Sequence, residues 1–347
     1  MGSWNSILIE IHAERRAQPG VISPSAEDVV RKRHLTALAD FTGRPTIVYA
    51  TAFLETWSLK SQADVSMHAG DKQGFKEVTQ GLRAGPLDVI LHAPGGTAEA
   101  AEGIAQVLRS KFTEIRFIVP VAAKSAATIL AMAGSAVVMD DTSELGPIDP
   151  QRQWVRRIGA TSETIQSPMW AIQQEWKKID DEIRADPSQL PKWYPIISQF
   201  GPSLLVECDI ALALSRSLVE QWLRDGMFSK RADPAADASR VADSLANHGL
   251  WQSHARMIGV DDAIGLGIEV VDLRRPENAD LSDKIWSAWH AISLTLDNTG
   301  AIKIFENSLG DSKVSQIQTL IGPSAPGVAT PAPRLPVNQA IRPRRRR

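Results

Sequence analysis

Short apolar runs alternate with helical patterns between residues 46 and 139, and this alternation constrains the fold more than any other feature of the sequence. The apolar runs, rich in β-branched residues, fall at residues 46–51, 87–92, 115–120 and 136–139. The segments typical of helices lie between them, at residues 75–83, 97–111 and 125–133. Strands that are joined through helices run parallel and are covered by those helices. The sequence therefore predicts an α/β fold with a largely parallel sheet.

The two ends of the sequence extend beyond this core. Residues 1–45 carry helical patterns at residues 5–16 and 28–41, so we expect an N-terminal helical extension there. Residues 46–150 are expected to form the core itself. From residue 322 onward, prolines alternate with small residues and arginines. Residues 322–347 cannot build a core from these side chains and are expected to be a disordered tail.

The sequence changes character after Pro150. Long helical patterns at residues 162–185 and 196–225 predict a helical insertion or subdomain over residues 151–250. Residues 251–321 are expected to return to the core and close it, with a strand at 268–272, a helix at 281–296 and a strand at 301–306.

The charge balance distinguishes the tail from the rest of the chain. The sequence has 38 lysines and arginines against 40 aspartates and glutamates, but six of the arginines lie in the acid-free tail. Acidic residues therefore outnumber basic ones in the remainder, which argues against non-specific nucleic-acid binding by the folded part. The tail is left as the basic element to which nucleic acid or acidic lipid would be attracted.

Cysteine usage and hydropathy indicate a cytoplasmic protein without a cofactor. The single cysteine, Cys208, excludes an internal disulfide and a cysteine-based zinc site, and it suits a reducing compartment. No stretch has the ~18 uninterrupted apolar residues of a membrane helix, and the first residues do not read as a secretory signal. The sequence has no phosphate loop, no dinucleotide fingerprint and no pair of metal-binding histidines on a helix, so neither cofactor nor metal is expected.

Residues suited to chemistry follow two of the predicted strands. His92 and Pro94-Gly95-Gly96 come at the end of one strand, and glycine lets the backbone turn its amides outward as an oxyanion hole requires. Ser125 follows the next strand and opens a helix, whose free amides and dipole suit a nucleophile. Taken separately, the Pro-Gly-Gly segment suits an ordinary strand-to-helix turn, and Ser125 suits an ordinary helix N-cap. Together they stand where parallel sheets build their sites, although His92 is expected to face a polar neighbour at the sheet edge rather than the site.

The combination of segments resembles a known group of proteins. The segments that carry this resemblance are Pro94-Gly95-Gly96, Ser125-Ala126-Ala127, Gly134 and Leu145-Gly-Pro-Ile-Asp-Pro-Gln151. They are similar to the Clp-protease and crotonase superfamily and, more closely, to the serine dehydrogenase proteinases (SDH-type), relatives of signal peptide peptidase A. The resemblance covers roughly residues 46–272. It implies a ClpP/crotonase-like spiral of ββα units, assembled into a homo-oligomer, in which a serine attacks a peptide carbonyl.

By this resemblance Ser125 is the nucleophile, and the amides of Gly95 or Gly96 and of Ala126 are the oxyanion donors. The chain departs from its relatives at one position of this turn. They usually continue after the serine with Ala-Gly, and Ala127 replaces that glycine here. A residue with a Cβ is expected to narrow the freedom of the backbone at the turn.

The general base has several candidates. In the Clp protease the histidine lies on the segment that reads Ile148-Asp149-Pro150 here, and the triad aspartate lies where this chain has His254. Asp149 and His254 would then be an acid and a base with exchanged positions, since a triad is defined by geometry. In the signal peptide peptidase branch a lysine from a later helix is the base, and Lys177 or Lys178 would take that place. Simpler roles are open as well: His254 would then be a structural histidine, and Lys177 and Lys178 would be solvated charges on a helix.

The sequence thus favours an intracellular serine peptidase that acts on peptides or proteins through an acyl-enzyme at Ser125, without metal or cofactor. Two other functions remain open. A catalytically inactive ClpP-like scaffold would use the same fold to bind proteins. A crotonase-type acyl-CoA enzyme would use the backbone amides to hold a thioester enolate.

Overall fold

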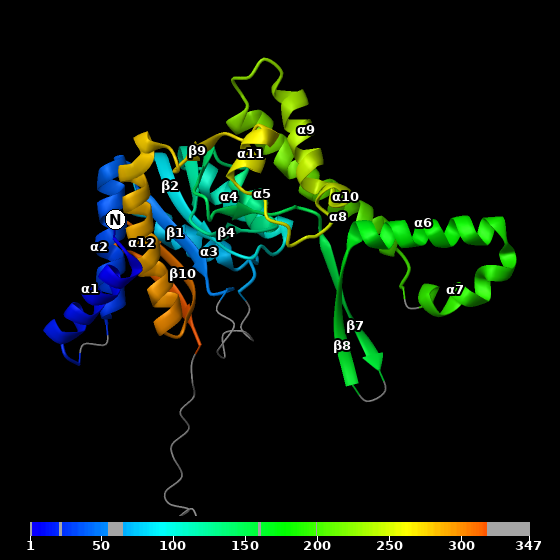
Figure 1. Cartoon of the computed structure of the whole chain (residues 1–347), viewed down its shortest axis with the longest axis horizontal. Helices are drawn as coiled ribbons and strands as arrows, with labels where there is room; N and C mark the ends of the chain where they lie inside the picture. The colour runs from blue at the N-terminus through cyan, green and yellow to red at the C-terminus, as the bar shows by residue number, and fades with distance from the viewer. Residues whose placement is uncertain (1, 21–22, 55–64, 159–160, 199, 318–347) are drawn as a thin grey trace, which may run out of the picture. The chain divides into compact units, whose positions relative to one another are not determined.

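A seven-stranded sheet forms the centre of the structure, a computed structural model that describes residues 2–20, 23–54, 65–158, 161–198 and 200–317 (Figure 1). Its strands lie in the order β11-β10-β1-β2-β3-β5-β9. Their bounds are β1 Thr46–Thr51, β2 Gly85–His92, β3 Phe112–Val119, β5 Ala136–Met139, β9 Val270–Asp272, β10 Ala301–Asn307 and β11 Ser312–Gln316. β1, β2, β3, β5 and β9 are parallel, whereas β10 pairs antiparallel with β1 and with β11. The α/β class and the largely parallel sheet are therefore confirmed.

Helices cover both faces of this sheet. The side chains of β1 alternate: Ile47 and Tyr49 lie in a core shared with α3, α4 and α5, whereas Val48 and Ala50 pack in a second core with α2 and α12. α1 packs on α12 through a smaller cluster around Ile7. The bounds of these helices are α1 Trp4–Ala17, α2 Ala26–Thr42, α3 Asp71–Thr79, α4 Ala98–Arg109, α5 Ala126–Ala131 and α12 Ala279–Asn298. The sheet is consequently buried on both sides, as its apolar strands predict.

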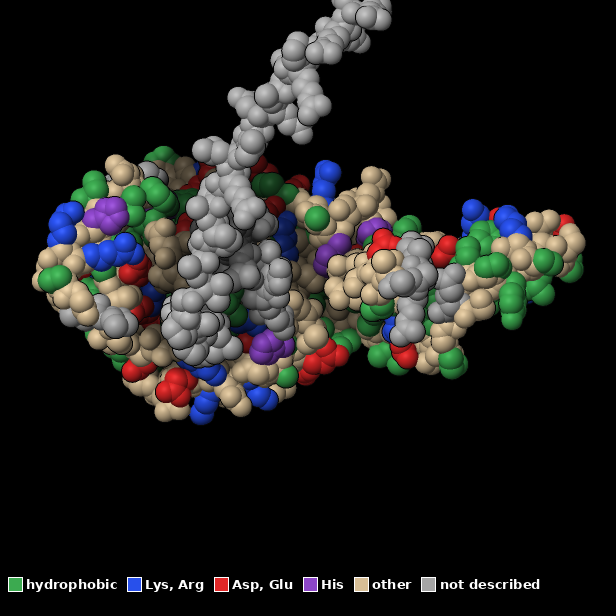
Figure 2. Space-filling model, turned by 90° about the horizontal axis from the view of Figure 1, so that it is seen from below, with side chains coloured by type: hydrophobic (Ala, Val, Ile, Leu, Met, Phe, Trp, Pro, Cys, Tyr) green, Lys and Arg blue, Asp and Glu red, His purple; other side chains and the backbone are tan. Residues whose placement is uncertain are grey.

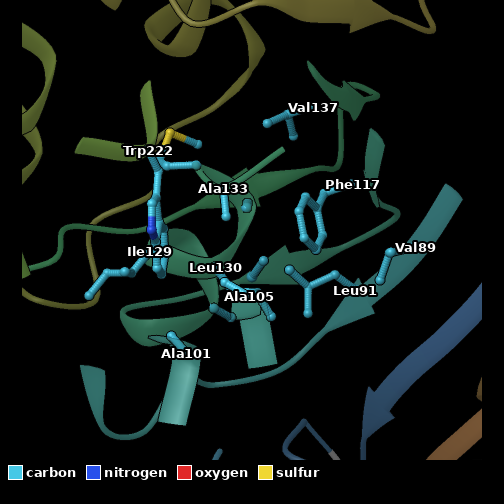
Figure 3. Packing of buried hydrophobic residues seen from close by; sticks show 14 of the residues in the cluster. Val89, Leu91, Ala101, Ala105, Phe117, Ile129, Leu130, Ala133, Val137 and Trp222 are labelled. Atoms are coloured by element: carbon cyan, nitrogen blue, oxygen red, sulfur yellow. The ribbon is translucent and has the colours of Figure 1, made fainter. Parts of the chain in front are cut away.

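The larger core fixes α5 beneath the sheet. Figure 3 shows Leu91 and Phe117, from β2 and β3, beside Leu130 of α5, with Trp222 on the far side of that helix. All six residues of α5 are buried. Burying a large apolar side chain stabilises a fold by about 1.5–3 kcal/mol, so a short helix with this many core contacts is held rigidly. Ser125 stands directly before it.

Short extended segments follow three of the parallel strands and form a second layer. β2 leads into residues 93–96, β3 into β4 (Ala122–Ala123) and β5 into β6 (Glu144–Leu145). The isolated pair between Ala93 and Ala123 and the pairing of β4 with β6 are both parallel. α4 and α5 follow the first two of these segments. Strand, short second strand and helix make up the ββα unit that the sequence resemblance implies.

A β-hairpin opens the part of the chain after Pro150. β7 (Gln151–Ile158) pairs antiparallel with β8 (Thr161–Pro168). The helix expected over residues 162–185 is therefore wrong for residues 162–168, because α6 begins only at Met169. The residues of β8 are largely polar and exposed, so the strand has no alternating apolar pattern by which the sequence would reveal it.

The remaining elements are mostly helical. They are α6 Met169–Ala185, α7 Leu190–Ile197, α8 Leu204–Trp222, α9 Pro234–Ala246, α10 His248–Trp251 and α11 Val260–Leu266, with short 3-10 helices η2 Pro187–Gln189 and η4 Pro276–Asn278 and a π-helix η3 Leu223–Met227. The helix expected over residues 196–225 is interrupted between α7 and α8. We call residues 169–197, from α6 to α7, the arm; in Figure 1 the arm and the hairpin lie away from the central sheet.

Two sequence expectations concern the chain outside the core. The tail expected over residues 322–347, with its arginines, lies outside the described residues. Within the described residues, no helix combines the length and the apolar character that crossing a membrane requires.

Candidate active site

Ser125 stands at a sharp turn between a strand and a helix. β4 ends at Ala123, α5 begins at Ala126, and Ser125 adopts φ 50° and ψ −118°. A positive φ is strained for a residue with a Cβ, and such strain collects at functional sites. The Ser125 side chain accepts no hydrogen bond from the first turn of α5, so it does not perform the capping role that a serine usually has in this position. The geometry is that of a nucleophile elbow, which exposes a side-chain hydroxyl at the end of a strand.

Gly95 lies directly against this turn. Its own φ is 99°, and a Cβ added to it would lie 2.6 Å from the Ser125 Cβ and 2.9 Å from the Ala126 nitrogen. Such distances are far below van der Waals contact. Only glycine allows the backbone of the Pro-Gly-Gly turn to approach the elbow this closely.

Gly96 is held from the other side by the backbone of Met67. The Met67 amide donates to the carbonyl oxygen of Gly95 at 2.7 Å, and the Thr97 amide donates to the carbonyl oxygen of Met67 at 3.2 Å. These two hydrogen bonds hold the residues on either side of Gly96, and the amide of Gly96 takes no part in them. The conformation of the turn is thus fixed by a segment that precedes α3.

The amides expected as oxyanion donors have no acceptor within the described residues. The N–H groups of Gly95, Gly96 and Ala126 donate no hydrogen bond there, whereas those of Thr97 and Ala127 do. Unpaired amides beside a serine hydroxyl are available to stabilise a tetrahedral oxyanion. Ser125 and the glycine turn follow two different strands in the sequence, and the fold brings them together.

Ala127 does not restrict the turn. It lies inside α5, is buried, and is not among the described residues with positive φ. The Cβ that replaces the family's glycine therefore occupies ordinary helical backbone, where alanine is the best residue. The expected narrowing of backbone freedom is wrong because the strained position is Ser125 itself, two residues earlier.

A cavity of about 400 Å³ opens beside Ser125. Gly96, Ser125 and Ala126 line one side of it, and residues of α8 line the other. Pro150 and Gln151, at the start of the hairpin, also contribute to its wall. The space is of the size that small-molecule and side-chain pockets have in proteins.

Asp149 and His254 lie together, as the exchanged acid and base would. Nδ1 of His254 donates to Oδ1 of Asp149 at 2.9 Å. Asp149 is completely buried, and its other carboxylate oxygen accepts from Gln151 Nε2 at 2.9 Å. A buried carboxylate on Nδ1 fixes the ring and leaves Nε2 as the reactive nitrogen. Neither of the two residues lines the cavity, whereas Ile148 and Pro150, on either side of Asp149, do.

His248 is a second histidine on the same carboxylate. Its Nδ1 donates to Oδ2 of Asp149 at 2.8 Å, and its ring lies 5.2 Å from the Trp170 ring. Sequence reasoning did not single it out. The available signal was its position six residues before His254, at the end of the region expected to be the helical insertion.

The lysines lie elsewhere. Lys177 and Lys178 are exposed on α6, and neither lines the cavity; Lys178 Nζ lies 5.8 Å from the centre of the Trp193 ring. Lys124, next to Ser125 in sequence, is ion-paired with Glu144 at 2.8 Å and donates to the carbonyl oxygen of Leu145 at 3.2 Å. Its ammonium is thus engaged by the strand that pairs with β4.

His92 is part of the core. Its ring lies between those of Phe53 and Trp289, at 4.7 and 4.6 Å, and its Nδ1 accepts from the Ala122 amide at 3.4 Å. Complete burial lowers the pKa of His92 to about 3. The polar neighbour expected for this residue is a backbone amide, and the ring stays neutral at ordinary pH. As for metals, the described residues contain no group of three or more His, Cys, Asp or Glu side chains that could hold an ion.

Comparisons with known proteins relate this site to serine proteinases. Residues 75–187 match the profile of the family described as ClpP-like SDH-type serine proteinase. Two uncharacterized proteins of Methanocaldococcus jannaschii are 41% identical over 80 residues (22% of this chain, 28% of the relative) and 39% identical over 66 residues (19% and 23%). The matched regions span only about a quarter of the length of these relatives, 28% of the first and 23% of the second.

Among solved structures, a serine-to-alanine mutant of the 1510-N membrane-bound stomatin-specific protease aligns with 63% of this chain and 79% of that chain, at 16% identity and a TM-score of 0.36. The family match has more bearing on the site, because it contains the glycine turn, Ser125 and Asp149. Over residues 75–187 the chain thus matches the ClpP-like SDH-type serine proteinases, the family that its sequence motifs indicated.

Proposed function

We propose that this chain is a serine peptidase that hydrolyses peptide bonds through an acyl-enzyme at Ser125. The observation that carries the proposal is the turn at Ser125, where a strained serine stands beside unpaired amides of Gly96 and Ala126 at the wall of a cavity. A plain helix cap needs neither the strain nor the free amides. The family match supports a peptidase in general.

The reaction follows from these groups. The Ser125 hydroxyl attacks the carbonyl carbon of the scissile peptide, an O–C bond forms, and the hydroxyl proton passes to the base. The carbonyl oxygen becomes an oxyanion that accepts from the amides of Gly96 and Ala126. The C–N bond then breaks, and the leaving amine takes the proton from the base. Water attacks the acyl-enzyme in the same manner, releasing the acid and restoring the Ser125 hydroxyl.

We infer that His254 is the base and that Asp149 orients it. The His254 side chain is 25% exposed against 11% for His248, so it exchanges protons with solvent more readily. Its segment is also tied to the elbow: Ile258 pairs with Leu145, and Lys124 Nζ lies 3.5 Å from the carbonyl oxygen of Arg256. Catalytic hydrogen bonds often tighten only when substrate is bound, and the proposal requires the His254 ring to reach the Ser125 hydroxyl in that complex.

The test is covalent labelling with a small dialkyl fluorophosphate, read by intact mass. We expect one adduct on the wild type and none on Ser125→Ala. His254→Gln and Asp149→Asn should slow labelling about 100-fold or more, as loss of a general base does. Lys177→Ala and Lys178→Ala, which change exposed side chains, are the controls and should label at the wild-type rate.

Other outcomes favour other functions. A folded wild type that is never labelled would favour the inactive scaffold. Binding of coenzyme A, together with an activity that survives Ser125→Ala, would favour the crotonase-type enzyme. Labelling that depends on Lys177 or Lys178 instead of His254 would reassign the base.

We propose in addition that the working form is a homo-oligomer. Large apolar side chains are exposed on the arm, among them Leu190 (47%) and Tyr194 (65%). Figure 2 shows hydrophobic side chains on the surface of this region. Exposed apolar patches of this kind mark interaction sites in soluble proteins, and symmetric association of identical chains is the commonest way to cover them.

A further inference from the structure

We propose that His248 is a positioning residue of the active site, which holds the Asp149 carboxylate in the orientation that fixes the His254 ring. This role rests on the proposed peptidase function, with His254 as the base. His248 acts on Asp149 alone and takes no part in the proton transfer itself.

The two histidines occupy different oxygens of Asp149. Oδ1 accepts from Nδ1 of His254 at 2.9 Å, whereas Oδ2 accepts from Nδ1 of His248 at 2.8 Å and from Nε2 of Gln151 at 2.9 Å. The carboxylate is completely buried, and no lysine or arginine of the described residues is ion-paired with it. A buried charge is costly unless hydrogen bonds satisfy it, so the carboxylate takes the orientation that its donors impose.

Paired backbone brings His248 to Asp149. The amide of Ile148, one residue before Asp149, donates to the carbonyl oxygen of Leu245 at 3.0 Å. Leu245 lies near the end of α9, three residues before His248, and is buried in the larger core. The place of the His248 ring relative to the carboxylate is therefore set by the core and by a backbone hydrogen bond.

The arm packs against His248. The amide of Met169, the first residue of α6, donates to the carbonyl oxygen of Pro150 at 3.0 Å, so the arm begins beside the segment that carries Asp149. The next residue is Trp170, whose ring lies 5.2 Å from the His248 ring. The His248 side chain is only 11% exposed, and its enclosed ring has little room to rotate.

His254 stands in a different setting. It lies between α10 and α11, where its neighbours Ser253 and Ala255 are exposed, and its own side chain is 25% exposed. A general base must reach the substrate and exchange its proton, whereas a group that orients another group must stay fixed. The exposed histidine suits the first task, and the enclosed histidine suits the second.

The experiment compares two substitutions of His248 in the full chain, by the rate of fluorophosphate labelling at Ser125. His248→Phe keeps a ring against Trp170 but cannot donate to Asp149, and it should slow labelling about 10-fold or more, because a small misplacement of a reacting group is costly. His248→Asn supplies an amide N–H in place of Nδ1 and should restore labelling to within about 3-fold of the wild type. A histidine that only fills space would give the opposite order.

The same substitutions at His254 calibrate the result. His254→Phe and His254→Asn should both slow labelling about 100-fold or more, because each removes the Nε2 that accepts the hydroxyl proton. Rescue by asparagine at residue 248 but not at residue 254 is the expected signature of one positioning residue and one base.

His290→Phe is the matched control. Nδ1 of His290 donates to the carbonyl oxygen of Gly2 at 2.9 Å, and the ring lies 5.5 Å from the Trp286 ring, so the setting is similar to that of His248. His290 lies on α12, on the face of the sheet opposite α5. His290→Phe should label at the wild-type rate, and urea unfolding of both phenylalanine variants reports the stability that each loses.

The outcomes separate this inference from the proposed function. Labelling of His248→Phe at the wild-type rate, or equal slowing by His248→Phe and His290→Phe, overturns the positioning role. Labelling as slow in His248→Asn as in His254→Asn also overturns it, because His248 would then accept the proton itself. A wild type that is never labelled at Ser125 instead overturns the peptidase proposal.

Discussion

Ser125 holds a backbone conformation that a serine on its own avoids, and its neighbours make that conformation persist. A non-glycine residue in such a region costs about 1–3 kcal/mol. The cost is offset because α5 behind it is entirely buried and Gly95 in front of it leaves no room for the turn to relax. The elbow therefore depends on the absence of one methyl group at Gly95.

We expect Gly95→Ala to abolish labelling of Ser125. The new Cβ would lie 2.6 Å from the carbonyl oxygen of Lys124, a backbone atom that cannot swing away. Relief requires the glycine turn or the elbow to shift, and a displacement of about 1 Å can cost 100-fold in rate. Labelling kinetics and urea unfolding of the same variant measure the effect.

Gly85→Ala is the matched control. Gly85 also has a positive φ, 116°, but a Cβ there meets nothing within 4 Å. It should lose about 1–2 kcal/mol of stability through backbone strain and label at the wild-type rate. Equal labelling by Gly95→Ala and Gly85→Ala would show that the close approach has no part in the site.

His92 should make stability depend on pH. In the unfolded chain a histidine takes up its proton near pH 6.5, whereas the pKa of His92 is lowered by burial to about 3 in the folded state. Between these values the unfolded state binds more protons, so the free energy of unfolding falls as the pH is lowered from about 6.5 and is unaffected above it. The expected contribution is a loss of about 2 kcal/mol between pH 7 and pH 5.

His92→Asn removes the titrating group and keeps an acceptor for the Ala122 amide. Urea unfolding at pH 7 and pH 5 should show a smaller loss of stability for this variant than for the wild type. His12→Asn, at an exposed position of α1, should retain the wild-type difference. If His92→Asn lost as much stability between pH 7 and pH 5 as the wild type, the His92 ring would not be the cause of the pH dependence.

At the scale of elements, the last long strand holds the glycine turn in place. Lys303 of β10 is buried, donates to the carbonyl oxygen of Ser66 at 2.6 Å and is ion-paired with Asp71 at 3.1 Å. Tyr49 of β1 also donates to Asp71, at 2.7 Å. The residue after Ser66 is Met67, whose backbone brackets Gly96. β10 thus acts on the glycine turn through a single intervening segment.

Lys303→Met should therefore slow the labelling of Ser125 and destabilise the fold. Removing one partner of a buried ion pair leaves the other uncompensated, at a cost of about 3–5 kcal/mol. The double variant Lys303→Met with Asp71→Asn removes both charges and should regain much of the stability in urea unfolding. Its labelling should remain slow if Lys303 positions the turn, whereas wild-type labelling would assign the lysine a purely structural role.

The sequence predicted elements well where burial left a local pattern. The strands at residues 46–51 and 136–139 were predicted to the residue, since both are short apolar runs bounded by turns. β8 was missed because polar, exposed residues look alike in a hairpin and in a surface helix. The sequence also predicted that Ser125 and the glycine turn lie close together, because the carboxyl ends of parallel strands meet at the same edge of a sheet. The Lys303 contact joins residues 237 apart in sequence, and such a pairing leaves no local signal.

At the scale of the whole molecule, the exposed apolar side chains of the arm predict self-association. The wild type should have a mass above that of one chain in light scattering at micromolar concentration. Tyr194→Glu, at a side chain that is 65% exposed, should lower that mass because it places a charge within an apolar contact. Phe41→Glu, on α2 and 48% exposed, should leave it unchanged. A wild type that is monomeric under these conditions would contradict the homo-oligomer.

The late position of β10 has a consequence for a chain that is still being synthesised. Domains form from the N-terminus onward as the ribosome releases them, and the elbow at Ser125 precedes β10 in the chain. Lys303, which anchors the Ser66–Met67 segment and through it the Gly96 turn, is therefore made long after Ser125. A nascent chain would possess its serine long before it possessed a finished oxyanion site, so the order of synthesis itself would delay proteolysis until the molecule has closed.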